Sequence, residues 1–207
     1  MSHVWPITLE KRKADGQWLE VVLYNGITML NSKEANYSYG NLQTAFKRMF
    51  KEVDLMWEGV NDVLVLGFGA GGVSQLVYKY QPQSNQVAVE ASAEVLDLYK
   101  RYFKPVPNTR VVQGDALDYI REENSPVDLI IVDVYEDLQV PDKFQTRAFV
   151  KLLKQRLKPG GKVVYNKVVS SNATQAQLDD LMIWFSAEFS SVRINEQLTI
   201  NRFIIAK

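Results

Sequence analysis

Two hydrophobic patterns alternate along the last two thirds of the chain. Short, continuous apolar runs are typical of parallel strands that are buried on both faces. Between these runs, apolar residues recur at three- and four-residue spacing, which is typical of helices. The predicted strands are 63–66, 86–90, 109–113, 127–133 and 162–168, and the predicted helices are 72–80, 93–103, 116–123, 144–157 and 175–189. These β/α units predict an α/β fold with a doubly wound, mostly parallel Rossmann-like sheet.

The two ends of the chain show a different pattern. Near the N-terminus, β-prone runs at 18–23 and 27–30 flank Asn25-Gly26, a pair that favours a tight hairpin because both residues tolerate positive φ. Asn41 can cap a helix that runs to about Trp57. The final β-prone runs, 192–195 and 199–205, predict an antiparallel last strand in the sheet. We expect a small β-hairpin segment at 1–40 and a Rossmann-like domain, with its leading helix, at 41–207.

Composition excludes several kinds of chemistry. The 207 residues include no cysteine and a single histidine, His3, which we expect in a mobile tail. Disulfides, Cys/His zinc sites and Ser-His-Asp catalysis are therefore disfavoured, and we expect no metal. A general base must then be a carboxylate, a tyrosine or a lysine. The N-terminus has no apolar run long enough for a signal peptide or a membrane span, so we expect a cytoplasmic location.

Charge is balanced overall but segregated locally. The 24 basic and 24 acidic side chains give a net charge of zero, which gives no support to a nucleic-acid binder or a polybasic membrane binder. Residues 115–142 nevertheless hold nine acids and one base, whereas residues 143–167 hold eight bases and no acid. The acidic segment suits a cationic substrate.

A glycine-rich loop follows the first buried strand and opens a helix. In Gly67-Phe68-Gly69-Ala70-Gly71-Gly72, Gly67, Gly69 and Gly71 let the backbone turn tightly and approach a ligand, and the helix N-terminus offers unpaired N–H groups. Glu90 ends the next strand, where a carboxylate can hold both hydroxyls of a ribose. This pattern fits either a dinucleotide enzyme or an S-adenosylmethionine-type nucleoside site.

Three features favour the second of these sites. Asp115 and Ala116 follow the third strand, which places an acid where an adenine amino group would lie. The Gly160-Gly161 turn precedes the fifth strand, and the closing β-pair matches the antiparallel end of a class I methyltransferase sheet.

From Asn25-Gly26 through Val168, the chain resembles the spermidine synthase (polyamine aminopropyltransferase) family. The matching pieces are the hairpin, the Val-Leu-x-Leu-Gly-x-Gly-x-Gly-Gly loop and four later positions: Glu90, Gly114, Asp115 and Asp133. The resemblance implies a class I methyltransferase fold. It also implies S-adenosylmethionine or its decarboxylated form as donor and a small cationic amine as acceptor.

The same resemblance implies roles for individual residues. Asp133 would be the base that deprotonates the amine, with Glu136 as a second acid. Glu90 would hold the ribose, and Asp115 the adenine. Tyr37 or Tyr39 would border the amine site, and Tyr135 would either line that site or pack beneath the loop. Aromatic residues near the hairpin would support a homodimer, as in the related family.

Two departures from the family pattern keep other functions open. Ala70 replaces an acid that, in the family, pairs with the aminopropyl ammonium of the donor. Residues 133–137 replace the family's Asp-x-x-Asp-Pro segment. The alternatives are transfer of a methyl group instead of an aminopropyl group, and a non-catalytic nucleoside-binding or scaffold protein with a degenerate site.

Overall fold

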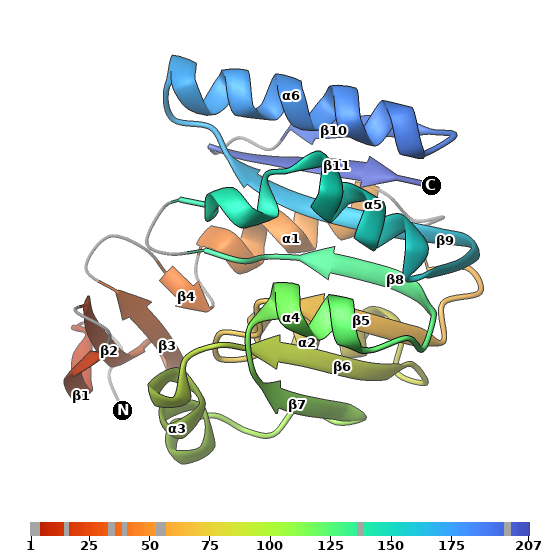
Figure 1. The fold of residues 1–207 in the computed structure, drawn as a ribbon. Coiled ribbons are helices and arrows are strands. Elements are labelled where there is room, and N and C mark those ends of the chain that lie inside the picture. The colour runs from red at the N-terminus through yellow and green to blue at the C-terminus, as the bar shows by residue number, and fades with distance from the viewer. Residues whose placement is uncertain are drawn as a thin grey trace.

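The computed structural model describes residues 5–14, 17–32, 36–38, 41–52, 57–135, 139–196 and 200–207; for residues 14, 17, 36–38 and 41 only the backbone is described. Within these residues the chain forms a four-stranded sheet and a seven-stranded sheet (Figure 1). The larger sheet has the order β10-β11-β9-β8-β5-β6-β7. Its strands are β5 (Asp62–Leu66), β6 (Asn85–Glu90), β7 (Thr109–Gln113), β8 (Val127–Val132), β9 (Leu157–Val168), β10 (Val192–Glu196) and β11 (Asn201–Ala206).

The doubly wound prediction is confirmed. Strands β7, β6, β5, β8 and β9 run parallel to one another, and β11 pairs antiparallel with both β9 and β10. In Figure 1 the arrowheads of β6, β8 and β9 point toward the small sheet, whereas β11 points the other way. Loops that follow the parallel strands are thus gathered at the edge of the sheet that faces the N-terminal part of the chain.

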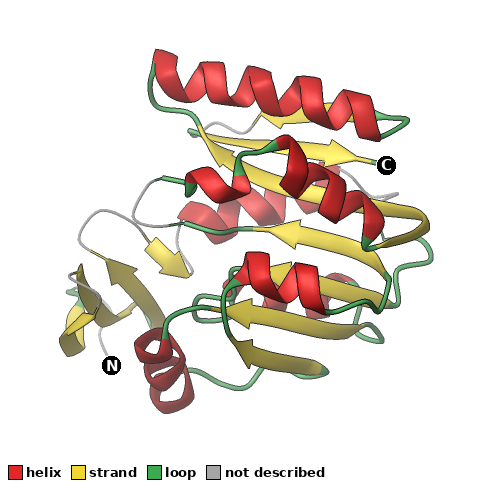
Figure 2. Ribbon diagram, viewed as in Figure 1, coloured by secondary structure: helices red, strands yellow, loops and turns green. Residues whose placement is uncertain are grey.

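Helices cover both faces of the large sheet (Figure 2). Buried side chains of the first three helices belong to one core cluster, and those of the last three belong to a second cluster on the opposite face. The helices are α1 (Asn41–Glu52), α2 (Gly72–Tyr80), α3 (Ala93–Tyr102), α4 (Ala116–Glu122), α5 (Arg147–Gln155) and α6 (Asn172–Glu188), with a short 3₁₀ helix, η2 (Asp142–Phe144). None of the described helices is both long and apolar enough to cross a bilayer.

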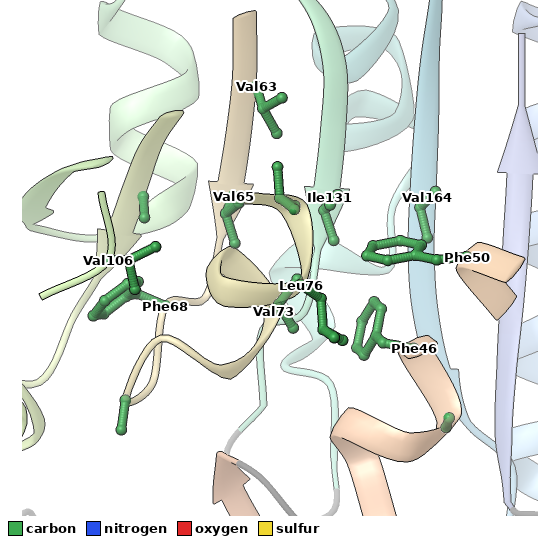
Figure 3. Packing of buried hydrophobic residues seen from close by; sticks show 14 of the residues in the cluster. Phe46, Phe50, Val63, Val65, Phe68, Val73, Leu76, Val106, Ile131 and Val164 are labelled. Carbon is green, nitrogen blue, oxygen red and sulfur yellow. The ribbon is translucent and has the colours of Figure 1, made fainter. Parts of the chain in front are cut away.

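Alternation along β8 shows why the strand is apolar from Leu129 to Val132. Leu129 and Ile131 point into the first cluster, whereas Ile130 and Val132 point into the second. Figure 3 shows part of the first cluster, in which Phe50 of α1 lies beside Val164 of β9 and Phe46 lies beside Leu76 of α2. A strand between two helical layers has no solvent-facing side, so neither set of side chains can be polar without a buried partner.

The N-terminal part is larger than the predicted hairpin. The hairpin consists of β2 (Gln17–Tyr24) and β3 (Ile27–Ser32), and it is flanked by β1 (Ile7–Ala14) and β4 (Asn36–Ser38). Strand β1 was not predicted because its sequence is mostly polar. Its charged side chains bind α3: Glu10 accepts a hydrogen bond from Tyr102 Oη at 2.8 Å, and Arg12 donates to Asp97 at 2.8 Å. His3 lies outside the described residues.

Two predicted boundaries are wrong, and a third lies partly outside the described residues. The helix from Asn41 is described as far as Glu52; residues 53–56 lie outside the described residues, and Trp57 lies in a bend. The predicted helix 144–157 is divided into η2 and α5, because Thr146 caps α5 by accepting a hydrogen bond from Phe149 N. Strand β9 begins at Leu157, five residues earlier than predicted, since Gly160 takes a positive φ of 78° and lets the strand continue.

Candidate active site

Four loops meet at the carboxyl edge of the large sheet, joined by main-chain hydrogen bonds. Asp133 N, after β8, donates to Leu66 O of β5 at 2.7 Å. Gly67 N, after β5, donates to Val89 O of β6 at 3.0 Å. Gly114 N, after β7, donates to Glu90 O at 2.9 Å. The segments that carry the candidate residues are therefore fixed to one another and to the ends of adjacent strands.

The glycine loop has the geometry that the sequence predicts. Gly67, Gly69 and Gly71 all have positive φ, at 92°, 57° and 85°. A Cβ on Gly71 would meet the Phe68 ring at 3.0 Å and Val106 Cγ2 at 3.1 Å, two side chains that Figure 3 shows together. Phe68 also packs edge-on against Tyr99, with ring centroids 4.8 Å apart. This aromatic contact packs the glycine loop against α3.

Glu90 is held rigidly at the end of β6. Its side chain accepts a hydrogen bond from Gly69 N at 2.8 Å through one oxygen and from Ser92 N at 3.0 Å through the other. Only 8% of the residue is exposed. Burial raises the pKa of Glu90 above its usual range, and the amide hydrogen bonds oppose that shift. Glu90 is thus fixed to the glycine loop, beside the place where the sequence predicts a ribose.

Asp133 has a strongly perturbed carboxyl group. Burial raises the pKa of Asp133 to about 7; a hydrogen bond from Asn166 opposes the shift, and the charge of Glu90 adds to it. Asn166 Nδ2 donates to Asp133 Oδ1 at 2.9 Å. Near neutral pH this carboxyl group can accept or release a proton, as a general base must.

Asn166 lies at the centre of a polar network that the sequence analysis did not predict. It is 1% exposed, and its Oδ1 accepts from Asn201 Nδ2 at 3.0 Å. Tyr135 Oη donates to the main-chain oxygen of Asn166 at 2.8 Å. The only available signal is the polar pair Asn166-Lys167, which follows the run Val163-Val164-Tyr165 near the end of the predicted strand. Tyr135 is therefore directed toward β9, and it lies next to Asp133 in the chain.

Asp115 binds two partners in the structure. One oxygen caps α4 by accepting from Leu117 N and Asp118 N at 2.9 and 3.2 Å, and the other accepts from Lys143 Nζ. Partial burial opposes ionisation, but the contact with Lys143 and the amide hydrogen bonds outweigh it and lower the pKa of Asp115. Ala116 is buried at the first position of α4. An adenine amino group at Asp115 would meet an oxygen that already binds a lysine.

Some candidate residues fall outside the description. Tyr39 and Glu136 are among the residues not described, and of Tyr37 only the backbone, in β4, is described. Their roles stay predictions. Within the described residues, no group of three or more His, Cys, Asp or Glu side chains could hold a metal ion.

Ala70 lies where the family resemblance expects an acid. It is completely buried in the first core cluster, which also contains Phe68 and Val73. A carboxylate at this position would need a charged partner to offset its desolvation. The glycine loop of this chain therefore offers backbone N–H groups and the Glu90 carboxylate at this point, and no acid of its own.

Comparisons with known proteins find curated relatives of similar sequence. A probable polyamine aminopropyl transferase from Bifidobacterium longum is 26% identical over 153 residues, which cover 72% of this chain and 34% of that protein. The chain matches only between 34% and 44% of the length of three such curated relatives.

Solved structures show the same fold. A probable spermidine synthase from Corynebacterium glutamicum has a TM-score of 0.80 at 16% identity, covering 96% of this chain and 79% of that one. Human methyltransferase-like protein 13, solved in complex with SAH, has a TM-score of 0.64 at 23% identity, with 80% of each chain covered. At these identities the likeness shows the fold alone.

The sequence profile of one family covers most of the site. The spermine/spermidine synthase domain matches residues 43–192, a range that includes the glycine loop, Glu90, Asp115, Asp133 and Asn166. The family resemblance drawn from the sequence is thereby confirmed, and this chain belongs to the spermine/spermidine synthase domain family.

Proposed function

We propose that this protein transfers an aminopropyl group from decarboxylated S-adenosylmethionine to a small aliphatic amine. The observation that carries the proposal is the placement of Asp133, whose pKa is about 7: its main chain packs against Gly67, the first glycine of the loop, and the charge of the buried Glu90 raises its pKa. Two carboxylates that share a buried position favour a cation between or beside them. Both the amine and the sulfonium group of such a donor are cations.

Asp133 supplies the base that the reaction needs. An aliphatic amine has a pKa of about 10 and is therefore protonated, and not nucleophilic, near pH 7. The ionised Asp133 attracts this ammonium group, accepts one of its protons and orients the freed lone pair. When bound, the donor supplies an electrophilic carbon next to a positively charged sulfur. The new C–N bond forms as the C–S bond breaks, and the bonding pair stays on sulfur as methylthioadenosine leaves.

The remaining residues hold the nucleoside. Glu90 is fixed by Gly69 N and Ser92 N, so that its outer lone pairs can accept from ribose hydroxyls without movement of the side chain. The positive-φ glycines allow the loop backbone to approach the donor closely. Asp115 would hold the adenine amino group in place of, or together with, Lys143.

A second function is favoured by one observation. Ala70 leaves the glycine loop without the acid that would pair with the ammonium of a decarboxylated donor. Intact S-adenosylmethionine carries a carboxylate beside that ammonium, so its internal charge balance makes such an acid less necessary. Methyl transfer to an amine is therefore the alternative, and the same Asp133 would serve as its base.

Calorimetry distinguishes these functions and tests the site. We expect decarboxylated S-adenosylmethionine and methylthioadenosine to bind the full chain, with affinity that falls in Glu90→Ala. Binding of intact S-adenosylmethionine alone would identify a methyltransferase. Failure of all three compounds to bind would refute both functions and favour the scaffold alternative. The cytoplasmic location, the homodimer, the lack of a metal and the lack of nucleic-acid or membrane partners stay predictions from the sequence.

A further inference from the structure

Three side chains from adjacent strands form a hydrogen-bonded row that ends at Asp133. Asn201, the first residue of β11, donates to Asn166 on β9, and Asn166 donates to Asp133, which follows β8. In the sheet β9 lies between β11 and β8. The row therefore crosses from the antiparallel strand to the carboxylate that we place at the reaction centre.

The orientation of the Asn166 amide determines what faces Asp133. A side-chain amide has one accepting oxygen and one donating nitrogen. In the structure Asn201 presents its Nδ2 as the donor, so that Oδ1 of Asn166 faces Asn201 and Nδ2 of Asn166 faces Asp133. A donor that faces Asp133 favours the carboxylate, whereas an oxygen in the same place would favour the protonated acid.

Because the Asn166 side chain is buried, its hydrogen-bond partners in the protein, and not water, determine the orientation of its amide. Asn166 and Asn201 are 1% and 9% exposed. The main chain of Asn166 is fixed as well, since its oxygen accepts from Tyr135 Oη and its strand pairs with β8 and β11. An amide that is enclosed in this way cannot replace a lost partner with solvent, so its orientation follows from its neighbours.

On the basis of the proposed function, in which Asp133 accepts a proton, we infer that Asn201 is a positioning residue: it orients the Asn166 amide so that Nδ2 of Asn166 donates to Asp133 and stabilises its carboxylate form. Among the described residues, the titratable groups that act on Asp133 or Tyr135 are Glu90 at the end of β6, Tyr135 after β8 and Tyr165 of β9. None of these groups is changed by substitution of Asn201.

Two substitutions separate orientation from charge. In Asn201→Asp an acceptor replaces the donor, so that Asn166 turns its Nδ2 toward residue 201 and its oxygen toward Asp133. In Asn201→Leu neither orientation is imposed. The matched control is Asn124→Asp, which adds the same charge at an exposed residue before the opposite end of β8.

The test is a carboxyl-carbon NMR titration of the full chain without ligand, with the Asp133 signal assigned by its loss in Asp133→Asn. We expect the pKa of Asp133 to rise by about one unit or more in Asn201→Asp. A smaller rise is expected in Asn201→Leu and no change in Asn124→Asp. If both Asn201 variants keep the wild-type circular dichroism spectrum and titrate Asp133 as the wild type does, the positioning role is wrong.

A measurement on the wild type covers the case in which the variants do not fold. The side-chain amide signals of Asn166 should shift with pH along the same curve as Asp133, because the amide donates to that carboxyl group. A flat amide response across the titration of Asp133 would overturn the inference.

Enzyme assays separate this inference from the proposed function. In Asn201→Asp the acid limb of the kcat/KM profile should move by the same amount as the Asp133 titration. If Asp133 titrates as expected but the wild type catalyses no amine-dependent transfer, the proposed function fails and the positioning role stands. If transfer occurs but its pH profile and the Asp133 titration are unchanged in both Asn201 variants, only the positioning role fails.

Discussion

A Cβ added to Gly67 would lie 2.1 Å from the main-chain oxygen of Asp133. The first glycine of the loop therefore does more than turn the chain, because it leaves the space that the backbone of Asp133 occupies. The same Gly67 has a φ of 92°, which L side chains rarely adopt. Glycine loop and candidate base are thus one packed unit.

Gly67→Ala should accordingly impair both stability and chemistry. Displacement of the Asp133 main chain, together with the positive φ, should destabilise the protein by about 2–4 kcal/mol. Urea unfolding measures this loss. The matched control is Gly160→Ala, where φ is 78° but no atom lies within 4 Å of the added Cβ. Equal costs in the two variants would show that Asp133 is not held by this contact.

The transfer rate should depend on the ionisation of Asp133. Because the pKa of Asp133 is raised to about 7, kcat/KM should fall tenfold per pH unit below that value, as the base becomes protonated. Stopped assays from pH 5 to 9 with a fixed total amine concentration, nearly all of which is protonated over this range, measure the profile. A flat profile across pH 6 to 8 would contradict the assignment of Asp133 as the base.

Asp133→Asn should stabilise the fold at high pH. The pKa of Asp133 is higher in the folded chain than the value of about 4 expected when unfolded, so ionisation favours unfolding as pH rises from about 4 through 7. Removing the charge should therefore raise the unfolding free energy by about 2–4 kcal/mol at pH 8, with little change at pH 4. The amide keeps an oxygen for Asn166. Equal effects at both pH values would mean that the raised pKa is absent in solution.

Glu90→Gln should change the site in two ways. The amide has one oxygen, so either Gly69 N or Ser92 N loses its partner, and nucleoside affinity should fall about tenfold or more. In addition, loss of the negative charge should lower the pKa of Asp133. Calorimetry measures the change in nucleoside affinity, and the carboxyl titration measures the change in the pKa of Asp133. An unchanged Asp133 titration would show that the two carboxylates do not interact.

Lys143 should compete with the nucleoside for Asp115. Because Lys143 donates to the oxygen that would hold the adenine amino group, Lys143→Met should raise methylthioadenosine affinity about two- to tenfold. The gain should vanish in an Asp115→Asn background, in which this competition no longer exists. Weaker binding in Lys143→Met would indicate that Lys143 itself contacts the nucleoside.

The sequence predicted those parts of the fold that local patterns encode. Residues 129–132 form a continuous apolar run because this part of β8 is buried on both faces, and such runs give strand positions directly. The polar strand Ile7–Ala14 escaped prediction because its charged side chains bind α3, a contact between residues about 90 positions apart. Such a contact leaves no periodic signal.

In the candidate site, too, the residues marked by a local sequence pattern could be predicted, and those whose role depends on distant contacts could not. Glu90 and Asp133 could be predicted because each ends an apolar strand, and the parallel sheet brings strand ends together. Asn201 could not be predicted, since its role depends on the register between β9 and β11, which pairs Asn201 with Val168. The partner of Asp115 was also missed, because Lys143 reaches it from a segment 28 residues away.

The central claim is that Asp133 deprotonates an amine that then displaces methylthioadenosine. The most direct test is to incubate the full chain with decarboxylated S-adenosylmethionine and an aliphatic diamine, and to quantify methylthioadenosine by mass spectrometry. We expect one methylthioadenosine per aminopropylated amine, and a rate at least about a hundredfold lower in Asp133→Asn. No release of methylthioadenosine that depends on the amine, or equal release by Asp133→Asn, would contradict the claim.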